Sequence, residues 1–180
     1  MLNKKELYAI FEYLNERLKE NQLHLELVIY GGSAMSLLYD KRPATRDIDA
    51  VFDSRNEKLL LNIFHDIEEI FGLNSDWLNQ DVRDPLSHIK SEDLVLFSSW
   101  EYLTVILPKE RQLLAMKVLA ARAEPSLDFI DSKLLCDTLG ISKKSEVIEI
   151  FVEFFPRELL RERQLRFIRY LGEDLGYEWR

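Results

Sequence analysis

An apolar run that ends abruptly at two glycines most constrains how this chain of 180 residues folds. Residues 23–30 alternate apolar and polar side chains and then become wholly apolar, which is typical of an inner β-strand. Gly31-Gly32 ends the run, and residues 33–39 are predicted to form a short helix. Residues 46–52 alternate charged and apolar side chains and indicate a second strand. The first third of the chain therefore predicts a strand, a glycine turn, a helix and another strand.

The remaining periodic segments place helices around further strands. Two long amphipathic helices are predicted at residues 4–20, where Asn3 and Glu6 resemble a capping box, and at residues 59–71, which Gly72 ends. Two more strands are predicted at residues 94–97 and 100–107, joined as a hairpin across Ser98-Ser99. After Pro108 the pattern is helical throughout, with expected helices at residues 110–122, 127–139, 143–155 and 157–171.

These elements predict an α+β fold with a small mixed sheet. We expect residues 1–108 to form the α/β core and residues 109–180 to form a helical part. No repeat or linker-like composition separates the two parts, so the helical part is expected to pack on the core as a single compact unit.

Charge and cysteine content narrow the class of protein. With 24 basic and 32 acidic side chains the net charge is −8, which argues against general electrostatic binding of nucleic acid. The single cysteine, Cys136, excludes an internal disulfide framework and fits a reducing compartment, so a cytoplasmic protein is expected. No signal-like start and no apolar run of about 18 residues is present, so neither export nor a membrane partner is expected.

Two carboxylates and a glycine turn carry the chemistry that the sequence suggests. Residues i and i+2 of a strand point to the same side, so Asp47 and Asp49 would present their carboxylates together. Mg²⁺ prefers such oxygen ligands and can bridge them to the phosphates of a nucleotide. The N–H groups at the start of the helix that follows Gly31-Gly32, aided by Ser33, can bind phosphate oxygens.

Other interpretations of single features remain open at this point. The Gly-Gly-Ser turn by itself is equally typical of an ordinary tight turn before a helix. Trp77 is expected to pack in the core or a lid, and the arginine-rich stretch 157–169 contacts an RNA backbone or simply forms a solvated helix face.

The order of the motifs resembles the nucleotidyltransferase fold of polymerase-β-like enzymes, in which a Gly-Gly/Ser turn precedes an Asp-hydrophobic-Asp strand. Over roughly residues 25–140 the chain is similar to a minimal bacterial group related to AbiEii-type toxins. The segments that carry this resemblance are Tyr30-Gly31-Gly32-Ser33-Ala34-Met35, Thr45-Arg46-Asp47-Ile48-Asp49, Trp77-Leu78-Asn79, Leu113-Leu114-Ala115-Met116-Lys117-Val118-Leu119-Ala120-Ala121-Arg122 and Leu127-Asp128-Phe129-Ile130-Asp131.

The resemblance implies roles for individual residues. Gly31, Gly32 and Ser33 would hold the triphosphate, while Asp47 and Asp49 would hold the metal. Lys117 would contact phosphate as a catalytic and nucleotide-binding residue, and Asp131, with Asp128, would contribute a base or a metal contact. Many relatives carry a third acidic residue on a later strand; Glu101 and Asp128 are the candidates here.

The function expected from this resemblance is nucleotidyl transfer dependent on Mg²⁺ or Mn²⁺. A nucleoside triphosphate would be the donor, and a hydroxyl of RNA (tRNA included) or of a protein would be the acceptor. The same resemblance implies an antitoxin partner and a role in a toxin–antitoxin pair. The alternative is a catalytically inactive nucleotidyltransferase-fold module that acts through a protein partner.

Overall fold

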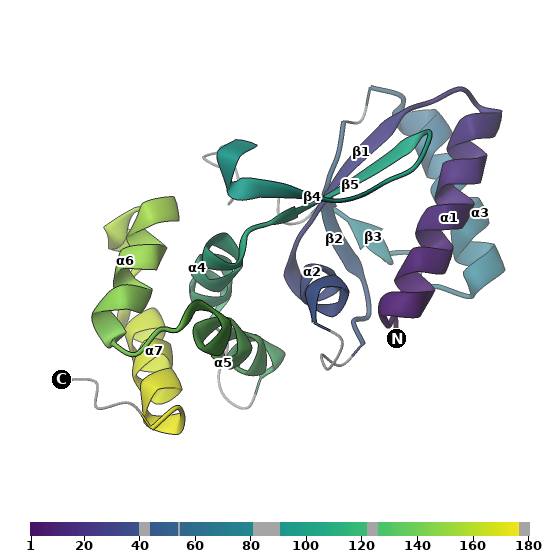
Figure 1. The fold of residues 1–180 in the computed structure, drawn as a ribbon. Helices are drawn as coiled ribbons and strands as arrows, with labels where there is room; N and C mark the ends of the chain where they lie inside the picture. Colours follow the sequence, from purple (N-terminus) through teal and green to yellow (C-terminus); the bar gives the residue numbers. More distant parts are fainter. Residues whose placement is uncertain (40–43, 54, 81–90, 122–125, 177–180) are drawn as a thin grey trace. The chain divides into compact units, whose positions relative to one another are not determined.

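The computed structural model describes residues 1–39, 44–53, 55–80, 91–121 and 126–176. These residues form two compact units (Figure 1). The sheet unit comprises the described residues of Met1–Ser87 and Leu94–Pro108, and the helical unit those of His88–Asp93 and Lys109–Arg180. The α+β class is confirmed, with a mixed sheet and a helical C-terminal part. The packing of the helical part on the core stays a prediction.

The sheet has five strands in the order β3-β2-β1-β5-β4. The central strand β1 (Leu25–Ile29) runs antiparallel to β2 (Ile48–Val51) and parallel to β5 (Leu103–Pro108). The outer strands are β3 (Leu78–Asn79), parallel to β2, and β4 (Leu94–Ser99), antiparallel to β5. Because β1 and β2 are antiparallel, the end of β1 lies beside the start of β2, which brings the glycine turn to the predicted carboxylates.

One face of the sheet forms the core of this unit. Helix α1 (Lys4–Glu20) begins at the predicted capping box, and α3 (Glu57–Phe71) ends at Gly72 in the left-handed conformation. The two helices pack side by side, and the apolar stripe of each is buried (Figure 1). The strand residues that alternate onto the buried face are Leu25, Leu27, Ile29, Ile48, Ala50, Leu103, Val105 and Leu107. The intervening residues, among them Glu26, Val28, Asp49 and Val51, are partly or wholly exposed, so the functional side chains lie on the face opposite this core.

Three strand and turn predictions differ from the structure. The turn of the β4–β5 hairpin is Trp100–Tyr102 rather than Ser98-Ser99, because Ser98 and Ser99 still pair with Val105 and Thr104. Trp100 then packs edge-on against Phe11 of α1, an attachment that a local turn rule cannot include. Strand β1 is shorter than residues 23–30, and the two-residue strand β3 has no counterpart among the predicted strands because it is too short to show periodicity.

The helical unit contains the four expected helices, and the last of them departs most from its expected boundaries. They are α4 (Glu110–Ala120), α5 (Leu127–Leu139), α6 (Lys144–Phe154) and α7 (Glu162–Asp174). Ser126 caps α5 and Gly140 ends it in the left-handed conformation. The last helix does not begin at Arg157: a short 3-10 turn, Arg157–Leu159, precedes it, and Leu160 breaks the run before Glu162. In the part of the chain that the structure describes, every helix is too short or too polar to cross a membrane.

The buried thiol of Cys136 predicts a loss of stability at alkaline pH. Burial, aided by the neighbouring charge of Asp137, raises the pKa of this thiol to about 12. In the unfolded chain the thiol ionises at about pH 9, so between pH 9 and 12 the unfolded state binds fewer protons than the native state. The free energy of unfolding therefore falls through this range by up to about 1.4 kcal/mol per pH unit.

Urea unfolding of wild type and Cys136→Ala between pH 7 and 10.5 measures this contribution. We expect the variant to be less stable at pH 7 because it leaves a small cavity, and the gap between the two proteins to shrink above pH 9. Other groups titrate equally in both proteins, so a gap that stays constant with pH contradicts the assignment.

Candidate functional site

Within the sheet unit, the side chain of Asp49 lies directly against the turn that contains Gly31. The Tyr30 N–H donates to the carbonyl oxygen of Asp49 at 2.8 Å, which extends the β1–β2 pairing up to the turn. Gly31 follows with φ of +61°, a conformation that L side chains rarely adopt. A Cβ on Gly31 would overlap the Asp49 Oδ2 atom and lie 3.4 Å from its Cγ. Only glycine therefore allows the Asp49 carboxylate to lie directly against the turn.

Helix α2 (Gly31–Leu38) presents the backbone donors that the sequence predicts. It begins two residues earlier than residue 33, so both glycines belong to its first turn. The cap residue Tyr30 makes no side-chain cap, and the first intrahelical bond is from the Ala34 N–H to the Tyr30 carbonyl at 3.2 Å. The N–H groups of Gly31, Gly32 and Ser33 thus have no acceptor within the helix, which makes its start suited to an anion.

The Ser33 hydroxyl closes the turn, and the role of Ser33 in binding a phosphate stays a prediction. Ser33 is fully buried, and its hydroxyl donates to the Tyr30 carbonyl at 2.9 Å. The hydroxyl proton is therefore used to close the turn, and what Ser33 offers to a phosphate is its main-chain N–H. Burial also raises the pKa of the adjacent Tyr30 phenol to about 12, so this phenol is neutral at physiological pH.

Asp47 lies just before the strand rather than within it. Strand β2 begins at Ile48, and Asp47 is half-buried in the preceding bend. Thr45 fixes this bend: its hydroxyl donates to the Asp47 carbonyl at 3.2 Å, and its backbone pairs with Leu2 through bonds of 2.6 and 2.9 Å. The N-terminal residues therefore anchor the segment that carries the first carboxylate of the pair.

Asn79 is a neighbour of Asp49 for which no role was predicted, although Trp77-Leu78-Asn79 is one of the segments that carry the resemblance. The parallel register pairs Asp49 with Asn79 and Ile48 with Leu78, so Asn79 occupies the strand position beside the second carboxylate. Trp77, just before it, is buried, donates from Nε1 to the Phe64 carbonyl at 3.3 Å and packs edge-on against the Phe64 ring. The packing interpretation of Trp77 is thus confirmed. Its attachment to α3 positions the short strand that holds Asn79.

Glu101 does not join this site. It lies in the β4–β5 turn, where its carboxylate pairs with the Lys19 ammonium of α1 at 2.8 Å. The register of Leu25 with Leu103 places that turn at the start of β1, whereas Gly31 follows its end. Five strand residues, or about 16 Å, separate the two ends. Among the described residues, no three histidine, cysteine, aspartate or glutamate side chains gather as a group that could hold a metal.

The donor set at the turn nevertheless fits Mg²⁺ or Mn²⁺ in the presence of a nucleotide. Asp47 and Asp49 offer carboxylate oxygens, and Asn79 adds an amide oxygen on the next strand. Mg²⁺ is commonly bound by one or two protein carboxylates, with phosphate oxygens and water completing its shell. Asp49 beside the uncapped helix start, with Asp47 two residues before it in the chain, is compatible with that requirement.

In the helical unit the structure brings together Lys117, Asp128 and Asp131. The Lys117 ammonium lies 2.9 Å from Asp128 Oδ1 and 2.8 Å from Asp131 Oδ2. The lysine and Asp131 side chains are only 8% and 1% exposed, so the cation and its partners are largely removed from water. Lys117 is on α4 and both aspartates are on α5, so the cluster also joins two helices. This cluster belongs to a different unit from Gly31–Ser33 and Asp49.

A family comparison places this α+β chain in the class of nucleotidyltransferase-type proteins. Residues 5–124 match the model of a family described as "Nucleotidyltransferase of unknown function (DUF6036)". Because the match covers more than half of the chain, the chain belongs to this family. The matched region includes the glycine turn, Asp47, Asp49 and Lys117, and it ends before Asp128 and Asp131. No curated protein and no solved structure matches the chain.

The first prediction from this geometry concerns Gly31. Replacing it by Ala imposes left-handed strain and also an overlap with the Asp49 carboxylate. Gly72 of the same unit is a matched control, because its φ is +62° but a Cβ there meets nothing within 4 Å. We expect Gly72→Ala to lower the free energy of unfolding by about 1 kcal/mol and Gly31→Ala by at least about 2 kcal/mol. Equal losses in urea unfolding would show that the carboxylate is not held against the turn.

A second prediction concerns the buried cation. Lys117→Met leaves two carboxylates without their cation in a largely buried place, which is expected to cost about 3 kcal/mol of stability. The control is Lys133→Met, which removes the exposed pair of Lys133 with Asp174 and should cost less than about 1 kcal/mol. Thermal or urea unfolding of both variants tests this, and a loss as small as that of the control would mean that the Lys117 cluster is not structural.

Proposed function

We propose that the chain is a metal-dependent nucleotidyltransferase that moves a nucleotidyl group from a nucleoside triphosphate to a hydroxyl acceptor. The observation that carries the proposal is the close approach of Asp49 to Gly31 at the uncapped start of α2. The proposed phosphate-binding N–H groups and the proposed cation-binding carboxylate thereby lie at the same backbone turn. Membership of a nucleotidyltransferase family supports transfer of a nucleotidyl group in general.

In the proposed reaction the acceptor oxygen forms a bond to the α-phosphorus, and the bond to pyrophosphate breaks. The N–H groups of Gly31, Gly32 and Ser33 bind the phosphate oxygens and orient the chain of phosphates. Asp47 and Asp49 would hold Mg²⁺ or Mn²⁺. Such a cation would supply neutralisation of the charge that develops on the departing pyrophosphate. Phosphoryl transfer depends mainly on such alignment and charge neutralisation, which fits a site built of backbone donors and carboxylates.

The roles of the helical unit are further parts of the proposal. Lys117 would contact phosphate, and Asp131, with Asp128, would accept the proton of the acceptor hydroxyl or contact the metal. In the structure the Lys117 ammonium already contacts both aspartates, so a phosphate contact requires this lysine to exchange or share a partner. Its inclusion in the matched family region supports a role for Lys117 more than for either aspartate.

The acceptor and the biological setting rest on the sequence resemblance. RNA, tRNA included, or a protein side chain would supply the hydroxyl, and an antitoxin protein would be the partner in a toxin–antitoxin pair of the AbiEii-related type. A cytoplasmic location is part of the same proposal, supported by a lone cysteine that is buried and unpaired.

A second candidate function is a catalytically inactive module that binds a nucleotide and acts through a protein partner. The neutral Asn79 stands beside Asp49, at the strand position where an acidic side chain would strengthen metal binding. Calorimetric titration with each nucleoside triphosphate, with and without Mg²⁺, separates the two functions. Binding that is independent of metal, without turnover, favours the module.

Asp49→Asn is the variant that tests the enzymatic proposal. The amide preserves the size of the side chain beside Gly31 but removes the charge that attracts the cation, so folding should be retained. Incubation with labelled nucleoside triphosphates, Mg²⁺ and total cellular RNA measures transfer by the wild type, and we expect it to fall at least about 100-fold in the variant. Asp66→Asn, at a partly exposed position of α3 where the carboxylate pairs with Arg17, is the control and should retain transfer. Undiminished transfer by Asp49→Asn would contradict the site assignment.

A further inference from the structure

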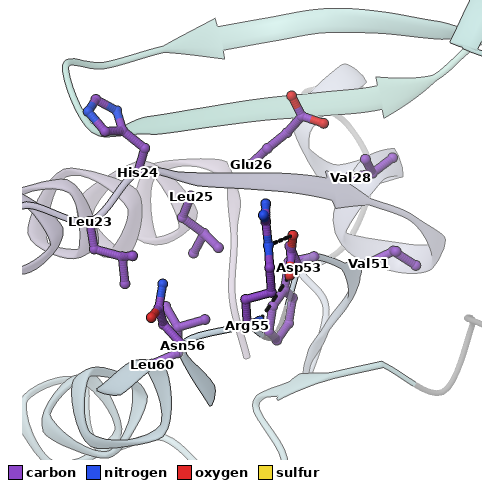
Figure 2. A pocket seen from close by; sticks show the side chains of 11 residues that line it. Leu23, His24, Leu25, Glu26, Val28, Val51, Asp53, Arg55, Asn56 and Leu60 are labelled. Carbon is purple, nitrogen blue, oxygen red and sulfur yellow. Dashed lines mark hydrogen bonds and ion pairs between the residues drawn. The ribbon is translucent and has the colours of Figure 1, made fainter. Parts of the chain in front are cut away.

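A pocket of about 580 Å³ opens beside the first half of β1, within the sheet unit (Figure 2). Residues of β1 and of the segment before it form one wall, and residues that follow β2 form the other. The apolar lining includes Leu23, Leu25, Val51 and Leu60. The charged residues of the lining are Glu26, Asp53 and Arg55. A pocket of this size accommodates a small organic ligand.

The pocket exists because β2 is shorter than β1. The antiparallel pairing covers only Val28 with Val51 and Ile29 with Ala50. Two residues further along the same register, Asp53 would lie opposite Glu26, and like charges directly opposite each other destabilise a strand pair. The Asp53 carboxylate instead accepts from the Arg55 Nε at 2.6 Å, and β2 ends at Val51. The edge of β1 from His24 to Glu26 therefore has no β2 residue beside it.

The edge of β1 from His24 to Glu26 carries a hydrogen-bond acceptor next to a hydrogen-bond donor. The Leu25 N–H donates to the Tyr102 carbonyl at 2.9 Å, on the β5 side. In a planar trans peptide the preceding carbonyl points the opposite way, so the His24 carbonyl faces the pocket side. Successive N–H groups of a strand point to opposite sides, so residues separated by an even number of positions share a side. The Tyr30 N–H points to β2. The Glu26 N–H, four residues earlier, therefore points to the same side as the Tyr30 N–H. A carbonyl and an N–H thus lie along one open edge.

We propose that this pocket binds the base of a purine nucleoside. The Watson–Crick edges of adenine and guanine each carry an N–H donor beside an acceptor, which complements the His24 carbonyl and the Glu26 N–H. Pyrimidine bases carry such a pair as well, and the larger face of a purine, which stacks more strongly, sets the preference. Leu25 and Leu60 supply apolar contact for the ring. Figure 2 shows the Arg55 side chain extending toward β1 between the pocket walls, where its planar guanidinium can stack on the face of a base.

The pocket favours a base over an added peptide strand or a phosphate. Val51 of β2 closes one end of the free edge, so an extended peptide could not continue along β1. The carboxylates of Glu26 and Asp53 repel phosphate groups, which favours an uncharged nucleoside moiety in the pocket. The nucleoside is either free in solution or the unstacked terminal residue of an RNA. This proposal is independent of nucleotidyl transfer, because it rests on the edge of β1 and not on Asp49.

The test uses the full chain without metal, titrated calorimetrically with adenosine, guanosine, cytidine and uridine. We expect both purine nucleosides to bind at least fivefold more tightly than either pyrimidine nucleoside. Glu26→Pro removes the proposed donor, and the pairing with β5 survives because the N–H of residue 26 points away from β5. It should weaken purine binding about tenfold. Glu26→Gln keeps the N–H, and its affinity for purine nucleosides should stay within about twofold of the wild-type affinity.

A second variant keeps the proposal testable if Glu26→Pro misfolds. Val51→Phe narrows the pocket from the end of β2 and should also weaken purine binding about tenfold. Purine nucleosides that fail to bind wild type, bind no better than pyrimidines, or bind Val51→Phe as well as wild type would overturn the proposal. A short single-stranded RNA ending in adenosine and the same RNA with an abasic end distinguish the sources. Preference for the intact end assigns the pocket to RNA, and equal weak binding of both, with tight binding of free adenosine, assigns it to the nucleoside.

Discussion

The contact on which the rest of the candidate site depends is the approach of the Asp49 carboxylate to the backbone of Gly31. It requires a residue without a Cβ and with a positive φ, and it requires β2 to run antiparallel to β1 so that the start of one strand meets the end of the other. The bond from the Tyr30 N–H to the Asp49 carbonyl fixes the register. A helix start and a carboxylate are thereby held together by main-chain geometry, which changes less than side-chain conformation when a ligand binds.

Periodic segments and their ends could be predicted from the sequence because both depend on nearby residues. The capping box of Asn3 and Glu6 starts α1 as expected, and Gly72 and Gly140 end α3 and α5 in the left-handed conformation. Elements fixed by distant contacts could not be predicted in this way. Strand β3 exists because Leu78 and Asn79 pair with β2, and the hairpin turn lies at Trp100 because that ring packs on α1.

The same distinction between features set by nearby residues and features set by distant contacts applies to the candidate site. The order of Gly31-Gly32 and then Asp47 and Asp49 predicted the residues of the candidate site; the structure places Asp49 against Gly31, and the roles of these residues stay predictions. No role was predicted for Asn79, because its proximity to Asp49 depends on a parallel register between two short strands. The double ion pair of Lys117 also needed the structure, since two helices must pack before Asp128 and Asp131 reach the same ammonium.

The length of β2 links the two places where ligands are proposed to bind. At its start, Asp49 lies against the glycine turn; at its end, Val51 leaves the edge of β1 open. Extending the strand by two residues would leave Asp49 in place but pair Asp53 with Glu26 and close the pocket. Like-charge repulsion between those two carboxylates opposes that extension, and the bond from Arg55 to Asp53 stabilises the turn away from β1. The open edge is therefore a consequence of charge at a single cross-strand pair, separable from the geometry that supports the carboxylate site.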